Sequence, residues 1–382
     1  MRFDSSLFWH HWGRIPWQQQ IEENRIYVRA LEQLGFKAAW VCEHHFFHDG
    51  NFACTPNPIL TNADLASHTT TLRLGQSPVS VPVWHPLRVA EDIALLDHMT
   101  GGRVEFGVGR GFNNRWCSQL HKDADMRNED RAFALFCECV DIILKAWTQD
   151  PFSYEGEFYR FPEPGWKEVD PNVAIEAPYY SSDGEYVGIS VLPKPFQEPH
   201  PPLYQMVTSS PRSIEFAASR GAAIMCSSRP VAAMRPDWLT YAEHASRQRG
   251  RQVGLGEFAS IQFGTYVAKT REQAYKVARD GYNFAMNGIP VRRDKLRQAM
   301  LGAGALTDAD LAGDDFDFAI RHNMLMVGTP EDVAEKIQLY RDGLNLSHYQ
   351  LFPSIPHLTF EQAMESLELF GTQVMPQFAS ND

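Results

Sequence analysis

Apolar positions along the chain follow two alternating spacings. Short runs such as 36–42 (FKAAWVC) and 103–109 (RVEFGVG) are apolar at consecutive or alternate positions, which is typical of buried strands. Longer segments place apolar residues three and four positions apart, as in 18–34, where Gly35 is expected to end a helix. The alternation of the two patterns predicts a series of strand–helix units.

Eight strands are predicted, with helical or irregular segments between them. Eight such units in 382 residues predict an α/β fold, the (β/α)8 or TIM barrel, whose functional residues lie at the carboxyl ends of the strands. A doubly wound fold of two domains would need a linker, and the sequence contains none, so residues 1–382 are expected to form a single domain. The predicted strands lie near Phe3 and at 36–42, 72–81, 103–109, 202–208, 222–226, 258–268 and 348–352.

Residues 151–202, between the fourth and fifth predicted strands, interrupt this alternation. The segment is rich in Pro, Gly, Tyr and Phe and contains no clear helical pattern. Its aromatic content argues against a flexible linker, because aromatic side chains are poorly represented in disordered segments. We expect an ordered insertion that acts as a lid over the mouth of the barrel.

Composition and charge narrow the class of protein. Hydrophobic residues make up 44% of the chain and charged residues 21%, enough apolar surface for a large core. The net charge of −12 argues against binding to nucleic acid or to an anionic membrane. The N-terminus lacks a basic and apolar leader, and no stretch approaches the roughly 20 apolar residues of a membrane helix. The chain is therefore expected to be cytoplasmic.

The stretch VCEHHFFHDG (41–50) gathers histidines and acids directly after a predicted strand. Adjacent strand residues such as His44 and His45 point to opposite faces, so the pair is not expected to bind one metal ion. A metal site would need ligands from elsewhere in the chain, an alternative that the sequence leaves open. Proton transfer fits better, because one of the two imidazoles would face a pocket and titrates near neutral pH. The remaining alternative is a polar strand end with a structural role only.

Two further stretches indicate a site for a phosphorylated ligand. GVGRGF (107–112) fails the dinucleotide fingerprint because Phe112 occupies the third glycine position, but it brings Arg110 and flexible backbone to a strand end. VTSSPRS (207–213) places the hydroxyls of Ser209, Ser210 and Ser213 where a helix begins, and helix N-termini attract anions. Together the two stretches suggest a phosphorylated cofactor.

In combination, these motifs resemble those of the bacterial luciferase-like, flavin-dependent monooxygenases. The resemblance runs from about residue 1 to 370 and implies a TIM barrel that uses reduced FMN (FMNH2) as cosubstrate together with molecular oxygen. The motifs that carry it are VCEHHFFHDG, HPLRVAEDIALLDHMTGGRVEFGVGRGF, EGEFYRF with PKPFQEPHPPL, SSPRSIEFAASRG and GTPEDVAEKI.

The resemblance assigns roles to individual residues. His44 matches the acid–base histidine beside the C4a position of the flavin, and Glu43 matches its neighbouring acid. Arg110 matches the arginine that contacts the flavin phosphate, and Ser210 and Ser213 match the hydroxyls that complete the phosphate site. No metal is implied.

At two positions the resemblance makes predictions about space and backbone. Gly109 stands where luciferase has a reactive cysteine, and we expect this departure to widen the space above the flavin ring. The family has a cis peptide at the end of the third strand, which here falls on Ser77–Pro78; a prolyl bond lowers the cost of cis from about 3 to about 1 kcal/mol. We predict that this bond is cis.

The resemblance also implies a reaction and partners. The chain has no NAD(P)H fingerprint, so a separate NAD(P)H:flavin reductase would supply FMNH2. A flavin C4a-hydroperoxide would then oxygenate a small substrate, and aromatic residues near strand ends, including Trp9, Trp84 and Trp116, suggest a hydrophobic or aromatic one. The alternatives are an oxidoreductase dependent on coenzyme F420 on the same barrel, and a flavin-binding relative without catalysis. A homodimer or related heterodimer is expected from the family.

Overall fold

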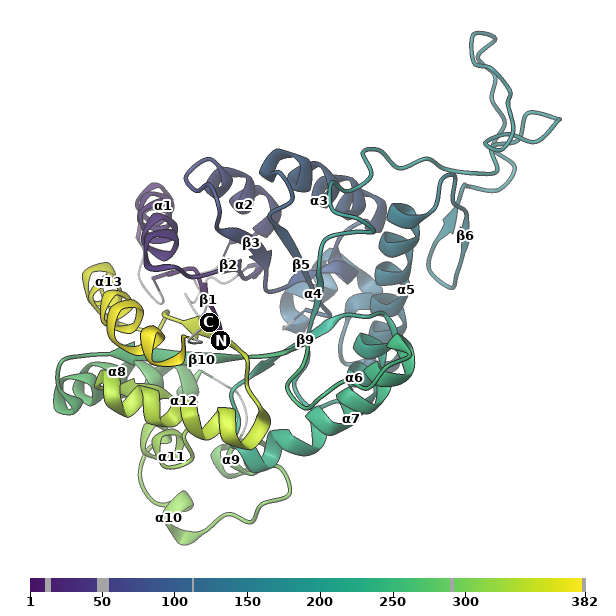
Figure 1. Ribbon diagram of the computed structural model, residues 1–382. Helices are drawn as coiled ribbons and strands as arrows, with labels where there is room; N and C mark the ends of the chain where they lie inside the picture. The colour runs from purple at the N-terminus through teal and green to yellow at the C-terminus, as the bar shows by residue number, and fades with distance from the viewer. Residues whose placement is uncertain (11–14, 47–54, 112, 289–291, 380–382) are drawn as a thin grey trace.

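The barrel predicted from the sequence is confirmed. The computed structural model describes residues 1–10, 15–46, 55–111, 113–288 and 292–379. Its eight barrel strands are all parallel, each pairs with the next, and β12 pairs with both β1 and β10, which closes the sheet on itself (Figure 1). The strands are β1 (Arg2–Ser6), β2 (Ala38–Val41), β3 (Arg73–Gln76), β5 (Val104–Gly109), β8 (Leu203–Met206), β9 (Ala223–Ser227), β10 (Ala259–Val267) and β12 (His348–Phe352).

Two short strands extend the barrel. The predicted strand 72–81 is divided at Ser77 and Pro78, and its second part, β4 (Val79–Ser80), pairs with the end of β5. A further strand, β11 (Met326–Gly328), runs parallel to the last residues of β10. Both additions lie at carboxyl ends of barrel strands, the side where this fold places functional residues.

Helices surround the barrel as an outer layer (Figure 1). Their ends follow the local signals: Gly35 ends the first helix in the left-handed region at φ 87°, and Thr329 forms a capping box with Asp332. The helices are α1 (Trp17–Leu34), α2 (Pro58–Ala66), η1 (Val81–Val83), α3 (Pro86–Thr100), α4 (Asn114–Leu120), η2 (Lys122–Ala124), α5 (Glu129–Thr148), α6 (Pro211–Ser219), α7 (Val231–Arg249), α8 (Arg271–Asn287), α9 (Arg293–Leu301), α10 (Asp308–Leu311), α11 (Asp315–Arg321), α12 (Pro330–Leu344), α13 (Phe360–Leu369), the π-helical η3 (Phe370–Val374) and η4 (Met375–Phe378).

Side chains alternate between the barrel interior and the helix layer, as strand geometry requires. On β2, Ala38 and Trp40 pack in an interior cluster with Tyr204 and Met225, separate from the main core. Glycine on the next strand makes room for the indole, because a Cβ on Gly75 would lie 2.2 Å from Trp40 Cε3. The same alternation carries the inward face of β2 on to residues 42 and 44.

Buried charges close the amino-terminal end of the barrel. The fully buried Asp4 accepts hydrogen bonds from Arg2 Nη2 at 2.8 Å and Trp40 Nε1 at 2.9 Å, and its Oδ2 lies 2.7 Å from His348 Nε2. Arg2 Nη2 also donates to Glu105 at 2.7 Å. Burial alone would raise the pKa of Asp4, but His348 and Arg2 outweigh it and hold this pKa at about 2. The base of the barrel is therefore an ionised network.

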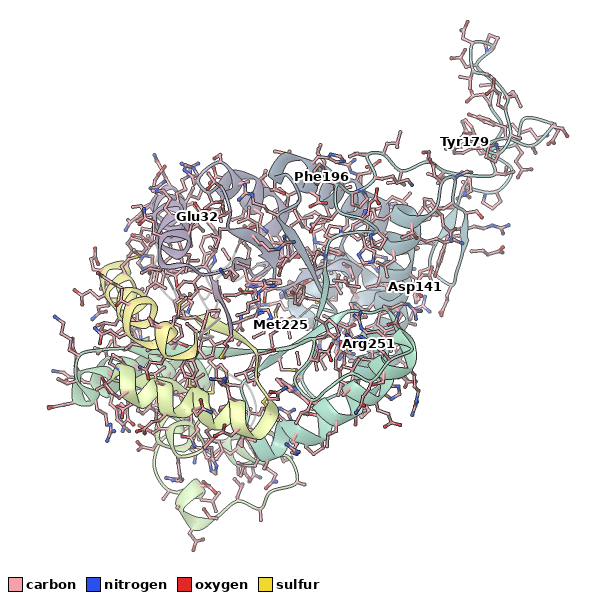
Figure 2. The ribbon with its side chains drawn as sticks, in the orientation of Figure 1. Glu32, Asp141, Tyr179, Phe196, Met225 and Arg251 are labelled. Carbon is pink, nitrogen blue, oxygen red and sulfur yellow. The ribbon has the colours of Figure 1, made fainter. Side chains whose placement is uncertain are left out.

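Residues 151–202 lie between α5 and β8 and mostly project from the barrel as an arm, in which Tyr179 is labelled (Figures 1 and 2). At its root, β6 (Tyr154–Glu155) and β7 (Arg160–Phe161) form an antiparallel pair. Farther out, the ring of Tyr186 packs against those of Trp166 and Tyr180. No residue of the arm lines the cavity described below, so its action as a lid stays a prediction.

Across the described residues, no helix combines the length and the apolar character that crossing a bilayer demands.

Candidate active site

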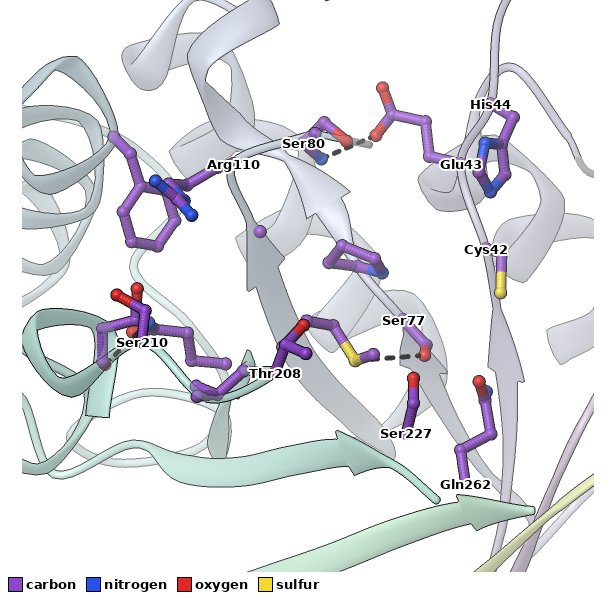
Figure 3. A pocket seen from close by; sticks show the side chains of 18 of the residues that line it. Cys42, Glu43, His44, Ser77, Ser80, Arg110, Thr208, Ser210, Ser227 and Gln262 are labelled. Carbon is purple, nitrogen blue, oxygen red and sulfur yellow. Dashed lines mark hydrogen bonds between the residues drawn. The ribbon is translucent and has the colours of Figure 1, made fainter. Parts of the chain in front are cut away.

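A cavity of about 410 Å³ opens at the carboxyl ends of the barrel strands (Figure 3). Seven barrel strands, or the residues just beyond them, contribute to its wall, and so does the short β4. The seven are β2, β3, β5, β8, β9, β10 and β12. Eight of the nine candidate residues from the sequence line it; the exception, Ser209, is exposed and does not line it. The eight are Glu43, His44, Ser77, Pro78, Gly109, Arg110, Ser210 and Ser213.

His44 continues the inward face of β2 and lines the cavity together with Cys42 (Figure 3). Its backbone amide donates to the carbonyl of Thr55 at 3.2 Å, which ties the end of β2 to the segment before α2. The half-buried imidazole stands edge-on to the indole of Trp116, with ring centroids 6.5 Å apart. Of the adjacent histidines, His44 is therefore the one in the cavity wall. His48 and Asp49, from the same motif, lie outside the described residues.

Glu43 is buried, and both of its carboxylate oxygens are engaged. Oε2 accepts from the backbone amide of Ser80 at 2.8 Å, and Oε1 accepts from Trp84 Nε1 at 2.9 Å. Oε1 also lies 2.8 Å from His45 Nε2. These contacts join the end of β2 to β4 and to the residues between η1 and α3. The geometry of Glu43 is therefore that of a structural anchor.

Pro78 and Gly109 form one wall of the cavity. The Ser77–Pro78 peptide is cis, as predicted. A Cβ added to Gly109 would lie 2.4 Å from Pro78 Cγ, and one added to Gly107 would lie 1.9 Å from the carbonyl oxygen of Gln76. The expectation that Gly109 leaves extra space is therefore wrong: the proline ring fills that space, and glycine is required for the two strands to approach.

Neutral polar groups form the end of the cavity nearest the barrel axis. Ser77 Oγ donates to the thioether of Met225 at 3.2 Å, and Gln262 Nε2 donates to Ser6 Oγ at 2.9 Å. Ser227 lies beside them (Figure 3). Sequence reasoning missed Ser227, the last residue of β9, and Gln262, which pairs with it from within β10. The signal for them was their inward parity along these strands.

The opposite end of the cavity is cationic. Arg110 follows β5, and its guanidinium lies over the ring of Phe133, 5.6 Å from the centroid. Ser210 is the N-cap residue of α6, yet its side chain makes no capping hydrogen bond, and the buried Ser213 lies one turn further on. Ser210 and Arg110 approach the cavity from facing sides (Figure 3). A guanidinium, a hydroxyl and a helix N-terminus at one place suit a phosphate.

Of the predicted aromatic wall, the tryptophans that the structure describes, Trp9, Trp84 and Trp116, do not line this cavity. Trp116 packs against His45, with ring centroids 5.1 Å apart, and Trp84 binds Glu43. Trp9 lines a separate apolar hollow beside α1 and α2. The aromatic side chains that do line the cavity are those of Phe136 and Phe352. As for metals, the described part of the chain brings together no set of three His, Cys, Asp or Glu side chains that could hold an ion.

Comparisons with known proteins show which family this chain resembles in sequence and fold. The model of the luciferase-like monooxygenase family matches residues 1–345. The oxygenase component of a flavin-dependent trigonelline monooxygenase from Acinetobacter baylyi is 26% identical over 390 aligned positions, covering 100% of this chain and 96% of that protein.

Two solved structures share the fold. The monooxygenase RslO1 from Streptomyces bottropensis superimposes with a TM-score of 0.78 at 23% identity, covering 99% of this chain and 100% of the other. The oxygenating constituent of 3,6-diketocamphane monooxygenase from Pseudomonas putida, solved in complex with FMN, gives a TM-score of 0.75 at 20% identity over 98% of each chain. The match to the family model extends from the first barrel strand to the end of α12. The chain therefore belongs to the luciferase-like monooxygenase family.

Proposed function

We propose that this chain is the oxygenase of a two-component, FMNH2-dependent monooxygenase that uses O2 to oxygenate a small hydrophobic or aromatic substrate. One observation carries the proposal: a single cavity joins an anion-binding end at Arg110 to an imidazole, that of His44. Its volume, about 410 Å³, falls in the range of roughly 300–1,000 Å³ that is usual for ligand pockets.

The residues present fit FMN, which is an anion at one end and a neutral planar ring at the other. Arg110, Ser210 and Ser213 would hold the phosphate, since the Ser210 hydroxyl is not committed to capping its own helix. Pro78 and Gly109 would offer a flat wall to the ring. Ser227 and Gln262, at the other end, supply neutral hydrogen-bonding groups suited to the polar edge of a flavin.

When bound, reduced FMN would supply the electrons that activate O2. The contribution of this chain is to orient the flavin, to limit access of water and to control a proton. His44 would carry that proton, because its imidazole continues the inward face of β2 and lines the cavity, and imidazole is the side chain best suited to proton transfer. Glu43 would act as a positioning residue that holds the β2 and β4 segments together.

A separate reductase is the proposed partner. The Acinetobacter relative is named an oxygenase component, which supports a division of labour between two proteins. The dimeric state expected from the family stays a prediction, as does the action of the arm as a lid.

The test begins with the flavin. Fluorescence titration should show that FMN binds and that Arg110→Ala weakens FMN while leaving riboflavin, which lacks the phosphate, unchanged. Purified chain supplied with FMN, NADH, a flavin reductase and ¹⁸O2 should then transfer one labelled oxygen atom to a member of a panel of small ring compounds. Tight binding of coenzyme F420 in place of FMN, with hydride transfer and no uptake of label, would overturn the proposal.

A further inference from the structure

Arg110 has a cationic neighbour at the phosphate end of the cavity. Arg212, in the first turn of α6, lies over the ring of Phe133, 4.6 Å from the centroid that Arg110 also faces. One carboxylate oxygen joins the two arginines: Glu129 Oε1 lies 2.7 Å from Arg212 Nη2 and 3.6 Å from Arg110 Nη1. The first turn of α5 therefore places a carboxylate, that of Glu129, next to the two arginines.

The bridging oxygen shows that one anion can reach both guanidiniums. Arg110 lines the cavity and is 25% exposed, and Arg212, beside it, is 34% exposed and accessible from solvent. The longer of the two distances, to Arg110, exceeds the range of a hydrogen bond and leaves this guanidinium able to donate to another acceptor. A phosphate oxygen is a stronger acceptor than a shared carboxylate oxygen, since the phosphate of FMN is a dianion at neutral pH.

We infer that Arg212 is a second phosphate-binding cation and that Glu129 is an internal anion that competes with the flavin phosphate for the arginine pair. The inference rests on the proposed binding of FMN. Without flavin, Glu129 pairs with Arg212 and lies beside Arg110, while Asp130 also pairs with Arg212, through Nη1 at 2.6 Å. With flavin, the phosphate takes over Arg110 and Arg212 against the charge of Glu129, so FMN is held less tightly than the two arginines alone would hold it.

Weaker retention suits a flavin that is delivered and returned. A cosubstrate that arrives from a reductase has to leave again after each turnover, whereas a resident cofactor does not. Glu129 is 62% exposed and can swing toward solvent when the phosphate enters and return when it leaves. The carboxylate would thereby set the residence time of the flavin without touching its ring.

The test compares matched variants by fluorescence titration with FMN, riboflavin and inorganic phosphate as probes. Glu129→Gln removes the competing charge and should bind FMN about threefold to fivefold more tightly, the effect of one exposed ion pair, with riboflavin unchanged. Glu157→Gln is the control: Glu157 is 59% exposed, pairs with Arg131 at 2.7 Å, and carries the same charge. It should leave FMN affinity as in the parent chain. Arg212→Ala should weaken FMN about tenfold and leave riboflavin unchanged.

The outcomes separate this inference from the proposed function. If the parent chain binds FMN but Glu129→Gln binds it equally or less tightly, the competing role of Glu129 is overturned while the proposed function stands. An unchanged FMN affinity in Arg212→Ala overturns the assignment of the second cation. Equal gains in Glu129→Gln and Glu157→Gln would indicate general charge repulsion and overturn the competition at this place. A parent chain that binds no FMN overturns the proposed function itself.

Discussion

The ring of Pro78 fills the place where a side chain at Gly109 would begin: a Cβ added to Gly109 would lie 2.4 Å from Pro78 Cγ. The two residues come from neighbouring strands that pair through Val79 with Val108 and Ser80 with Gly109. Because the contact is with a ring and not with the end of a flexible chain, a side chain at 109 would have to move backbone.

Gly109→Ala should therefore destabilise the barrel and disturb the cavity wall. We expect a loss of about 1–3 kcal/mol in the free energy of unfolding, the usual cost of overpacking, and weaker FMN binding. Urea unfolding and FMN titration measure the two effects. Gly254→Ala is the control, because a Cβ there would meet only Glu257 Oε2 at 4.0 Å. Equal stability of the two variants would contradict the close approach of Pro78.

His44→Ala should separate binding from chemistry. The FMN affinity should stay within about twofold of the parent, whereas the oxygenation rate should fall by about 10² or more, the usual contribution of a general acid or base. Added imidazole should restore part of the rate. His45→Ala is the matched variant: His45 contacts Glu43 at 2.8 Å, so its loss should lower the melting temperature more than the rate. The reverse ranking of the two histidines would assign the proton to His45.

Glu43→Gln should act on stability before it acts on chemistry. The carboxylate accepts from the Ser80 amide and from Trp84 Nε1, and it contacts His45 Nε2. The amide of glutamine can replace only one of its two oxygens as an acceptor. We expect a loss of about 1–3 kcal/mol in the free energy of unfolding, because a buried donor is left without its partner. Chemical denaturation checks the loss. A variant of unchanged stability that has lost its activity would show instead that Glu43 takes part in the reaction.

Asp4→Asn should change how stability depends on pH. The folded pKa of Asp4, about 2, lies below the ordinary value of 3.8, so the unfolded chain binds the proton more readily than the folded one. The stabilisation is present above about pH 4 and is lost as the pH falls through 2; a shift of this size corresponds to about 2–3 kcal/mol. The difference in free energy of unfolding between the parent and Asp4→Asn should thus shrink from pH 5 to pH 2. A constant difference would show that the charge of Asp4 does not contribute.

Prediction from sequence succeeded where local spacing determines structure. The eight strands follow from short apolar runs, and parity along β2 is enough to put one of two adjacent histidines, His44, into a pocket at the strand end. Arg110, Ser210 and Ser213 were also found, because each lies at a recognisable junction between a strand and a helix.

Contacts between distant segments could not be predicted in the same way. The anchoring of Glu43 depends on how Ser80 and Trp84 are placed by the third barrel strand and the segment after it. The meeting of Pro78 with Gly109 depends on the stagger between two strands, which no local pattern records. The pairing of Arg212 with Glu129 joins the start of α6 to the start of α5, 83 residues apart.

The alternation along β2 constrains the length of this segment more tightly than it constrains the composition of the segment. His44 reaches the cavity because it lies four positions after the inward-facing Trp40, an even interval along the chain. Deleting or inserting one residue between them would turn the imidazole toward the helices and bring a neighbouring side chain, the carboxylate or the second imidazole, to the inward face, although every residue of the motif would still be present. A relative of this chain with the same residues and a strand one residue longer would therefore present a different side chain to the cavity.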